Sequence, residues 1–480
     1  MSQLVIQPGG ALRGRARVPG DKSISHRALM LGALAEGDSH IAGFLPGGDC
    51  LATLDCIRAL GVEIEVCSDG FSRSDANSCA TAKAATAKAA TAKAATAKAA
   101  TMNVTIHGRG LYGLQVSVAP LDCVRSGTTM RLLAGILAGQ TFDSVLAGDP
   151  QLLRRPMRRI TEPLRRIGAD ITDTEGHGPL VIRGKKLRGS EHQLTVASAQ
   201  VKSAILLAGL FAEGVMVVHE CGPARDHTER MLKSQIRELR ITNHESRTAQ
   251  PPLATDGLTV TLDPTAIDYL ETLNMTVPGD MSSAAFPLVA ALLVADSEIT
   301  LEGVGVNPTR TGLLDVLAAM GADIVLGNQH EQGGEPVADL TVRSASLMGT
   351  EIGGDTVVRM IDEFPILAVA ATQAEGRTVV RDAAELRVKE TDRVAVVVEE
   401  LRKLGARIEP LPDGFVIEGP MPLRGAAVDS HGDHRLGMAL AVAGLVAEDE
   451  TIIENAGCIA DSFPGFVGII QELGGNISKA

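Results

Sequence analysis

Apolar and polar residues follow one recurring order along the chain, which predicts an amphipathic helix followed by a short strand. Upstream of each strand the apolar residues have helical spacing, as in Leu313, Val316 and Met320. A glycine separates helix from strand in five places, at Gly61, Gly168, Gly321, Gly405 and Gly474. Glycine readily adopts the left-handed conformation that ends many helices, so we expect a helix C-terminus at each of them.

The spacing of these glycines predicts six repeated units, each of roughly 70 to 80 residues. A sixth helix end is expected near residue 240, where a helix predicted from Thr228 to Leu239 ends without a glycine. Strand hairpins follow the helices. In one of them, residues 408–410 turn at Asp413-Gly414 into residues 415–418.

A second repeat divides the chain into two halves. The segment PGDKS at residues 19–23 returns as PGDMS at residues 278–282, and each copy leads a strand into a helix. The simplest account is two homologous domains of three units, with small ligands bound in the cleft between them. We expect one domain to comprise residues 1–18 and 256–480 and the other residues 19–255. The first strand, residues 4–6, is expected to pair with the last unit.

Residues 80–101 repeat the sequence TAKAA and predict a solvated insertion. A five-residue period carries the lysines around a helix and leaves no apolar face to bury. The segment falls between predicted strands at residues 64–66 and 103–106, so we expect it at the tip of a hairpin. An arm that binds a nucleic acid or another partner is the alternative.

The composition of the chain indicates which classes of binding partner to expect and in which cellular compartment the protein works. The net charge of -13 argues against a nucleic acid or an anionic membrane as the main partner, but it leaves small anions open. The absence of Trp and the few Phe and Tyr residues predict aliphatic cores. The seven Cys show no CxxC pair or secreted framework, which indicates free thiols in a reducing cytoplasm. Neither a signal peptide nor a long apolar run is visible, so no membrane partner is expected.

Basic residues recur at predicted helix starts within this acidic chain. Lys22, Ser23 and Arg27 surround the start of an apolar helix, where free N–H groups and the helix dipole attract anions. Taken alone, an ordinary capped helix with solvated cations would explain that segment equally well. Similar groups follow at residues 125–131, 154–156, 198–202, 362–363, 389–393 and 433–435. Several such helix starts facing one cleft would suit a pair of multiply anionic substrates.

These segments make the chain similar to the 5-enolpyruvylshikimate-3-phosphate (EPSP) synthase family. The matching strings are PGDKSISHR, SGTTMR, RRP, ASAQVKSA, ARDHTE, NPTRTG, IDEFP, ELRVKETDR and DHR, in family order over nearly the whole chain. Several of them are nearest the glyphosate-insensitive class. The resemblance implies an α/β fold of two similar domains, each of three βαβαββ-type repeats, with the active site in the interdomain cleft. It also implies a monomer without a metal or an organic cofactor.

The resemblance implies that the 5-hydroxyl of shikimate 3-phosphate adds to C2 of phosphoenolpyruvate while C3 is protonated, after which phosphate leaves. By motif match Asp362 is the base, and Glu390 and Lys22 are proton-transfer groups. Shikimate 3-phosphate would contact Lys22, Ser23, Arg27, Ser198, Ala199, Gln200, Arg225, Asp362 and Lys389. Phosphoenolpyruvate would contact Lys22, Gly127, Arg155, Gln200, Arg393 and Arg435. Gly127 leaves room where glyphosate, the family's inhibitor, also lies.

Two other functions stay open, and departures from the family pattern bear on whether the chain is active. Arg125 stands where members commonly carry Asn, and Asp461-Ser462 replaces a well-known lysine before the C-terminal Phe-Pro. One alternative is the sister transferase that acts on UDP-N-acetylglucosamine and uses a loop cysteine, for which Cys123 would be the candidate. The other is a catalytically dead anion-binding scaffold. A metal site at residues 431–434 fits no familiar zinc spacing.

Overall fold

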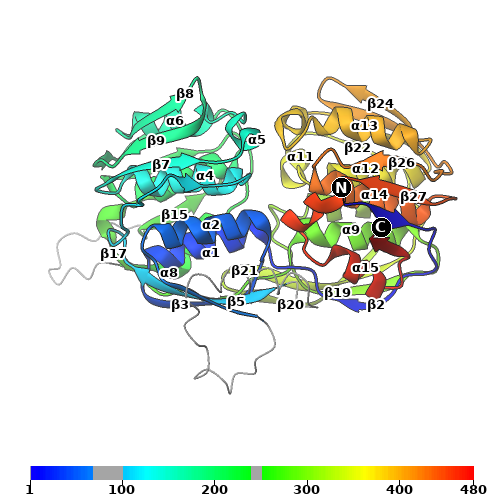
Figure 1. Ribbon diagram of the computed structural model, residues 1–480, viewed down its shortest axis with the longest axis horizontal. Coiled ribbons are helices and arrows are strands. Elements are labelled where there is room, and N and C mark those ends of the chain that lie inside the picture. The colour runs from blue at the N-terminus through cyan, green and yellow to red at the C-terminus, as the bar shows by residue number, and fades with distance from the viewer. Residues whose placement is uncertain (1, 69–100, 239–250, 480) are drawn as a thin grey trace, which may run out of the picture. The chain divides into compact units, whose positions relative to one another are not determined.

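The computed structural model describes residues 2–68, 101–238 and 251–479 (Figure 1), which form two compact units. The described part of the C-terminal unit comprises residues 2–21 and 278–479, and that of the N-terminal unit comprises residues 22–68, 101–238 and 251–277. The unit boundaries thus follow residues 21 and 277 rather than residues 18 and 255, because strands within 256–277 pair with strands of the N-terminal unit. Of the predicted insertion, residues 80–100 lie outside the described residues.

Three four-stranded sheets frame the N-terminal unit. In each, a parallel pair of strands is followed by two antiparallel neighbours. The first sheet contains β18 (Asn274–Thr276), β3 (Glu36–Phe44), β5 (Met102–Arg109) and β4 (Ile64–Ser68). The second contains β6 (Leu121–Asp122), β7 (Asp143–Ala147), β9 (His177–Arg183) and β8 (Asp170–Thr174). The third contains β11 (Glu191–Gln193), β13 (Met216–His219), β16 (Thr259–Leu262) and β15 (Leu253–Asp256).

The C-terminal unit repeats this arrangement of strands three times. Its first sheet contains β2 (Arg13–Ala16), β19 (Glu298–Gly305), β21 (Glu335–Arg343) and β20 (Asp323–Gln332). The second contains β22 (Glu351–Ile352), β23 (Gly376–Val380), β25 (Gly414–Gly419) and β24 (Arg407–Leu411). The third contains β26 (Ala427–Asp429), β27 (Thr451–Glu454), β1 (Leu4–Ile6) and β28 (Ile477–Lys479). Six equivalent sheets confirm the six predicted units, and β1 pairs with the last of them as expected.

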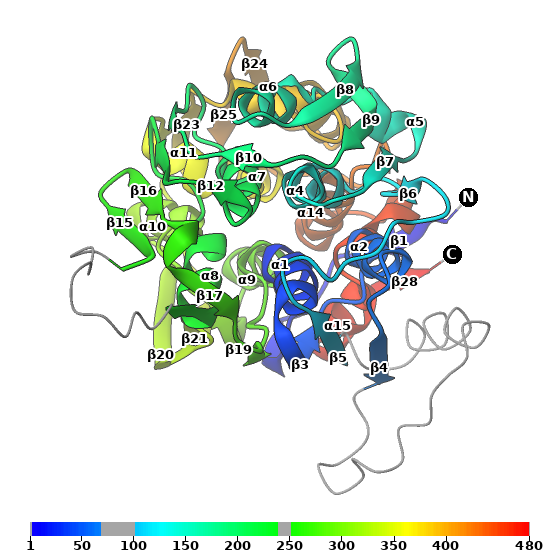
Figure 2. The same cartoon turned by 90° about the vertical axis from the view of Figure 1, so that its left-hand side faces the viewer.

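Each of the six repeats contains, besides its sheet, one deeply buried helix and a second helix that is more exposed. The buried helices are α1 (Lys22–Leu34), α4 (Gly127–Ala138), α7 (Ala199–Gly209), α9 (Met281–Leu293), α12 (Phe364–Gln373) and α14 (His434–Val446). The others are α2 (Gly48–Ala59), α6 (Arg158–Arg166), α8 (His227–Gln235), α10 (Gly312–Ala319), α13 (Arg393–Lys403) and α15 (Phe466–Glu472). In Figure 2 the helices α1, α4 and α7 lie inside the N-terminal unit, with strands around them. The motifs that begin with Lys22, Arg125, Ser198 and Asp433 lie at the starts of four of these buried helices, whereas residues 389–393 lead into α13.

Shorter elements complete the described chain. They are α5 (Pro150–Leu153), α11 (Asp355–Arg359), β10 (Leu187–Arg188), β12 (Ala212–Glu213), β14 (Ile236–Glu238), β17 (Ile267–Leu270) and the 3-10 turns at Pro264–Ala266, Ala384–Val388 and Ala456–Asp461. The cores are built mainly from Val, Ile, Leu and Ala, as the composition predicted. Among the described helices, none has the length and apolar character needed to cross a membrane.

The five predicted helix-ending glycines all adopt left-handed backbone conformations, with φ between 84° and 99°. This confirms the repeat signal, because a side chain at such a position is strained. The sixth helix was predicted too long. Helix α8 ends at Gln235, and the chain continues as β14, which pairs with β17. The last residue of that prediction, Leu239, lies outside the described residues.

The two copies of the PGD segment pair with each other. Gly20 and Gly279 form an isolated antiparallel bridge. The Asp21 N–H donates to the Pro278 carbonyl and the Asp280 N–H donates to the Pro19 carbonyl, both at 2.8 Å. The strands before these segments also exchange sheets: β2 precedes α1 but pairs with β19, whereas β18 precedes α9 but pairs with β3. This exchange explains why the unit boundaries lie later than the sequence pattern indicated.

Candidate active site

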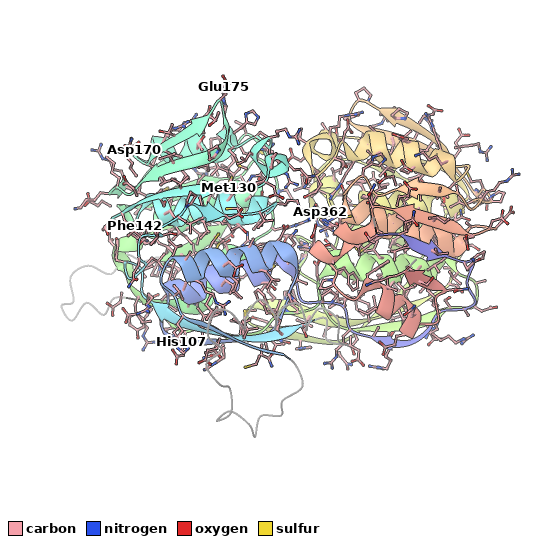
Figure 3. All side chains as sticks on the ribbon, viewed as in Figure 1. His107, Met130, Phe142, Asp170, Glu175 and Asp362 are labelled. Carbon is pink, nitrogen blue, oxygen red and sulfur yellow. The ribbon has the colours of Figure 1, made fainter. Side chains whose placement is uncertain are left out.

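Asp362, labelled in Figure 3, lies close to three cationic side chains of the C-terminal unit. It immediately precedes Glu363, which occupies the N-cap position of α12. Its Oδ1 lies 3.3 Å from Lys389 Nζ and 3.4 Å from Arg393 Nη1, and its Oδ2 lies 3.9 Å from Arg435 Nη2. The structure therefore brings the predicted base into contact with three of the predicted substrate ligands.

Arg393 is almost completely buried and is surrounded by carboxylates. It donates to Asp433 from Nε (2.8 Å) and Nη2 (3.2 Å), and from Nη2 to Glu390 (2.8 Å). Burial opposes its charge, but Asp433 and Glu390 outweigh burial and raise the pKa of Arg393 above its ordinary value. Burial likewise disfavours the charge of Asp433, yet Arg393 holds the pKa of that carboxyl below its usual range. Glu390, a predicted proton-transfer residue, is thereby fixed beside Asp362.

A second buried arginine, Arg310, supports the same region. Its Nη2 donates to Asp280 Oδ1 and to Ser282 Oγ, both at 2.8 Å, and its Nη1 lies 3.3 Å from Asp21 Oδ2. Ser282 in turn donates to Glu363, the neighbour of Asp362. Sequence reasoning missed Arg310 because its partners come from distant segments and only the fold brings them together.

In the N-terminal unit the start of α1 is tied to α2, α7 and α8. Lys22 forms an ion pair with Asp49, the second residue of α2. Arg27 is buried: its Nε donates to Thr228 Oγ1 (2.6 Å), its Nη2 to Ser203 Oγ (2.8 Å) and its Nη1 to the Ser23 carbonyl (2.9 Å). These bonds orient the start of α1, where Lys22 and Ser23 lie.

Gly127 is the first residue of α4, and the guanidinium groups of Arg155 and Arg131 lie next to the space that a side chain at this position would occupy. A Cβ added to it would lie 3.3 Å from Arg155 Nη1 and 3.4 Å from Arg131 Nη1. Arg131 Nη1 donates to Gln200 Oε1 (2.5 Å), and Gln200 Nε2 donates to Thr128 Oγ1 (3.0 Å). The structure thus brings together Gly127, Arg155 and Gln200 from three predicted motifs. It adds Arg131, whose position four residues after Gly127 on one helix face was a usable signal.

The predicted residues Ser198 and Ala199 stand at the start of α7, and Arg225 lies between β13 and α8. Beneath them Lys202 is buried between two carboxylates. Its Nζ lies 2.7 Å from Glu220 Oε1 and 2.6 Å from Glu229 Oε1. It also donates to the carbonyl of Ala224 at 3.4 Å, which links α7 to the segment that carries Arg225.

The alternatives considered for Cys123 and for residues 431–434 do not match the geometry. Cys123 is completely buried, and a hydrogen bond with Cys56 together with burial raises the pKa of its thiol, which opposes a nucleophilic thiolate. His431 contacts Glu400 at 2.7 Å, whereas Asp433 is engaged with Arg393. Arg125, the departure from the family pattern, directly precedes Ser126, whose Oγ accepts from the Thr129 N–H to cap α4.

Two units of three βαβαββ repeats, with cationic motifs at helix starts, define the enolpyruvyl transferase fold. A sequence profile described as EPSP synthase (3-phosphoshikimate 1-carboxyvinyltransferase) matches residues 6–100 and 92–470. The chain belongs to the EPSP synthase family.

Its relatives match along nearly their whole length. The chain is 50% identical over 457 residues to the 3-phosphoshikimate 1-carboxyvinyltransferase of Herpetosiphon aurantiacus, with 95% of each protein covered. It is 47% identical over 473 residues to the enzyme of that name from Desulforamulus reducens, with 98% of this chain and 99% of the relative covered. Among solved structures it is similar to EPSP synthase from Acinetobacter baumannii, with a TM-score of 0.80, 41% identity and 100% of both chains covered.

Proposed function

We propose that the chain transfers the enolpyruvyl group of phosphoenolpyruvate to the 5-hydroxyl of shikimate 3-phosphate and releases phosphate. The observation that carries this proposal is the contact of Asp362 with Lys389, Arg393 and Arg435 at 3.3–3.9 Å. Addition of a hydroxyl to phosphoenolpyruvate needs a base for the hydroxyl proton and cations for the anionic groups. This arrangement supplies both within one cluster.

In the C-terminal unit, Asp362 accepts the proton of the 5-hydroxyl and Lys389 binds shikimate 3-phosphate. Arg435 and the Nη1 edge of Arg393 bind phosphoenolpyruvate. Glu390 takes part in proton transfer at C3. Its contact with Arg393 at 2.8 Å supports this role, because the arginine holds the carboxyl close to Asp362.

In the N-terminal unit, helix starts bind the same two anions. Free N–H groups and positive dipole ends at α1, α4 and α7 support this assignment. Phosphoenolpyruvate contacts Gly127, Arg155, Gln200 and Lys22, and shikimate 3-phosphate contacts Lys22, Ser23, Arg27, Ser198, Ala199, Gln200 and Arg225. The Lys22–Asp49 ion pair gives Lys22 a carboxylate partner that a substrate anion replaces. Lys22 then also serves in proton transfer.

The test is turnover with purified full-length protein. Phosphate release is timed with phosphoenolpyruvate and either shikimate 3-phosphate or UDP-N-acetylglucosamine. The proposal expects release with shikimate 3-phosphate alone. Release only with the sugar nucleotide would identify the sister transferase, a function that the buried thiol of Cys123 disfavours. Tight calorimetric binding of shikimate 3-phosphate without turnover would identify an anion-binding scaffold.

We further propose that the enzyme works as a cytoplasmic monomer and that glyphosate binds at the phosphoenolpyruvate ligands. All six described cysteines are free thiols, which supports a reducing compartment. Light scattering tests the monomer, and a mass of two chains would refute it. Competition of glyphosate with phosphoenolpyruvate in the turnover assay tests the inhibitor site.

A further inference from the structure

Glu400 is a completely buried carboxylate near the end of α13, far along that helix from the residues assigned above. Lys403 Nζ donates to both of its oxygens, at 2.8 and 2.9 Å. His431 Nε2 lies 2.7 Å from Oε1, and the backbone N–H of Asp429 donates to Oε2 at 3.0 Å. A carboxylate can only accept, so the His431 ring donates. The buried charge is therefore matched by four contacts.

Two of these contacts hold the segment 429–433, which joins β26 to α14. His431 and Gly432 have φ values of 52° and 72°, so two consecutive residues are left-handed. A non-glycine residue in this region is uncommon and needs support from its surroundings. The His431 N–H donates to Asp429 Oδ1 at 2.7 Å, and its ring reaches Glu400. Glu400 thus supports the strained turn at both residue 429 and residue 431.

The turn leads directly into the candidate active site. Asp433 caps α14 by accepting from the Arg435 N–H at 2.9 Å, and it accepts from Arg393 at 2.8 Å. The guanidinium of Arg435 lies 3.9 Å from Asp362. Arg393 and Glu400 are seven residues apart, which is about two turns of α13, so they share one helix face. Residues on this one face of α13 therefore contact both ends of the turn: Glu400 contacts Asp429 and His431, and Arg393 contacts Asp433.

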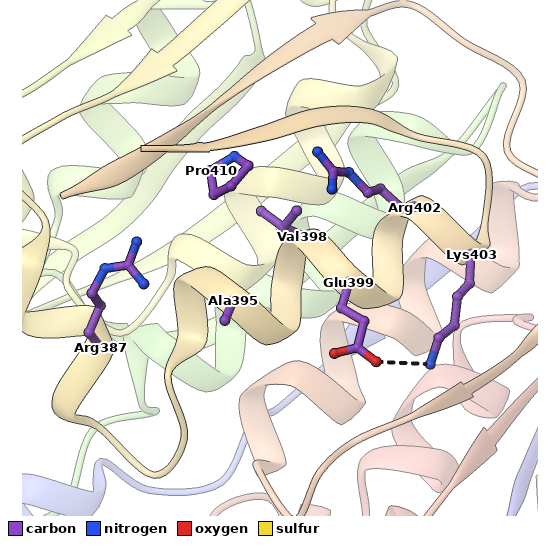
Figure 4. Close-up of a pocket in the computed structure, with 7 residues that line it drawn as sticks. All are labelled: Arg387, Ala395, Val398, Glu399, Arg402, Lys403 and Pro410. Carbon is purple, nitrogen blue, oxygen red and sulfur yellow. Dashed lines mark ion pairs between the residues drawn. The ribbon is translucent and has the colours of Figure 1, made fainter. Parts of the chain in front are cut away.

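Lys403 supplies the cation of this cluster. The groups of Glu399, Glu400 and His431 lie close enough together to hold a metal ion. However, Lys403 Nζ lies 3.6 Å from Glu399 (Figure 4). It also lies 2.8 Å from Glu400. The ammonium group of Lys403 thus neutralises the negative charge of these two carboxylates, as a bound cation would. This favours a structural role for the cluster over a metal site.

We propose that Glu400 is a positioning residue for the reaction: through His431 and the Asp429 N–H it fixes the turn 429–433 and so places Arg435 for phosphoenolpyruvate. The proposal rests on the proposed role of Arg435 as a ligand of that substrate. Small displacements of a binding group cost about 100-fold in rate in severe cases, so loss of one support is expected to cost about tenfold.

The experiment compares His431→Asn and Glu400→Gln with Glu399→Gln in the full-length enzyme. Asn tolerates the left-handed conformation but is too short to replace the imidazole, so His431→Asn removes the contact without straining the backbone. Glu399 is the matched control, because it is the neighbouring glutamate and also contacts Lys403, but its side chain is 57% exposed. The readouts are KM for each substrate and hydrogen exchange of the amides at residues 430–435.

We expect His431→Asn and Glu400→Gln to raise KM for phosphoenolpyruvate about tenfold. KM for shikimate 3-phosphate should change much less. Exchange at residues 430–435 should quicken in both variants, and Glu399→Gln should match the wild type. Unchanged KM and exchange in a folded His431→Asn variant would overturn the inference, as would equal rises in both KM values. Absence of turnover in the wild type would instead refute the proposed function, while exchange would still test the support of the turn.

Discussion

Arg393 donates to both carboxylate oxygens of Asp433, and their side chains are only 1% and 0% exposed. This pair joins the start of α13 to the start of α14. A buried ion pair contributes little net stability when intact, but removal of one partner leaves an uncompensated charge. The pair is therefore expected to be sensitive to substitution on either side.

Asp433→Asn should destabilise the protein by about 3 kcal/mol, the low end of what loss of one buried ionic partner costs, because Glu390 and Asp362 still face Arg393. The free energy of unfolding from urea titration measures this loss. Glu409→Gln is the matched control, since Glu409 pairs with Arg402 but its side chain is 77% exposed. Its unfolding midpoint should equal that of the wild type. Equal midpoints for Asp433→Asn and wild type would contradict the prediction.

Asp362→Asn should abolish most turnover while the protein stays folded. The amide keeps the size of the side chain and the three neighbouring cations, but it no longer accepts a proton. Loss of a general base typically lowers kcat about 100- to 10,000-fold, and the KM values should change far less. Steady-state phosphate release measures both constants. Asp355→Asn, on the exposed start of α11, should match the wild type. A kcat for Asp362→Asn within a few-fold of wild type would exclude Asp362 as the base.

The repeats could be predicted from sequence because their signals are local. A glycine that follows a helical pattern predicts a left-handed backbone conformation at that residue, and all five such glycines have this conformation. The resemblance predicted that Asp362, Lys389 and Arg393 serve one site; the structure places the two cations 3.3 and 3.4 Å from Asp362, and their roles stay predictions.

Features that depend on distant partners could not be predicted. The hydrogen bonds that bury Arg27, to Ser203 and Thr228, join residues that are 176 and 201 positions apart. The unit boundaries depend on β2 and β18 exchanging sheets, which the order of the helices does not reveal. Helix α8 was predicted too long because the pairing of β14 with β17 overrides its apolar spacing.

Gly127→Ala should weaken phosphoenolpyruvate binding selectively. The new Cβ would lie 3.3 Å from Arg155 Nη1, which is tighter than an ordinary van der Waals contact, so that guanidinium group must shift by a few tenths of an ångström. Arg131 Nη1, at 3.4 Å, would be at the edge of ordinary contact. Displacement of a substrate ligand is expected to raise KM for phosphoenolpyruvate about tenfold. KM for shikimate 3-phosphate should change less. Gly468→Ala is the control, since nothing lies within 4 Å of its added Cβ. An unchanged KM would contradict the assignment of Arg155 to this substrate.

Lys202→Met should destabilise the N-terminal unit in a pH-dependent way. The ammonium of Lys202 lies between Glu220 and Glu229, and all three side chains are less than 10% exposed. Loss of the ammonium leaves two buried carboxylates without a cation, which should cost about 3–5 kcal/mol at pH 8. Lys186→Met is the control, because the exposed pair of Lys186 with Glu213 should leave the unfolding midpoint unchanged.

The sign of the pH dependence follows from Glu220 and Lys202. Burial raises the pKa of Glu220, so in the variant folding favours its protonated form, and stability should fall as pH rises above the ordinary glutamate pKa of about 4.3. In the wild type, burial opposes the charge of Lys202 but Glu229 and Glu220 raise its pKa, so its contribution is full below about pH 10. The difference between Lys202→Met and wild type should therefore be smaller at pH 5 than at pH 8. Urea titrations at the two pH values measure it, and an equal difference at both would show that neither carboxylate takes up a proton.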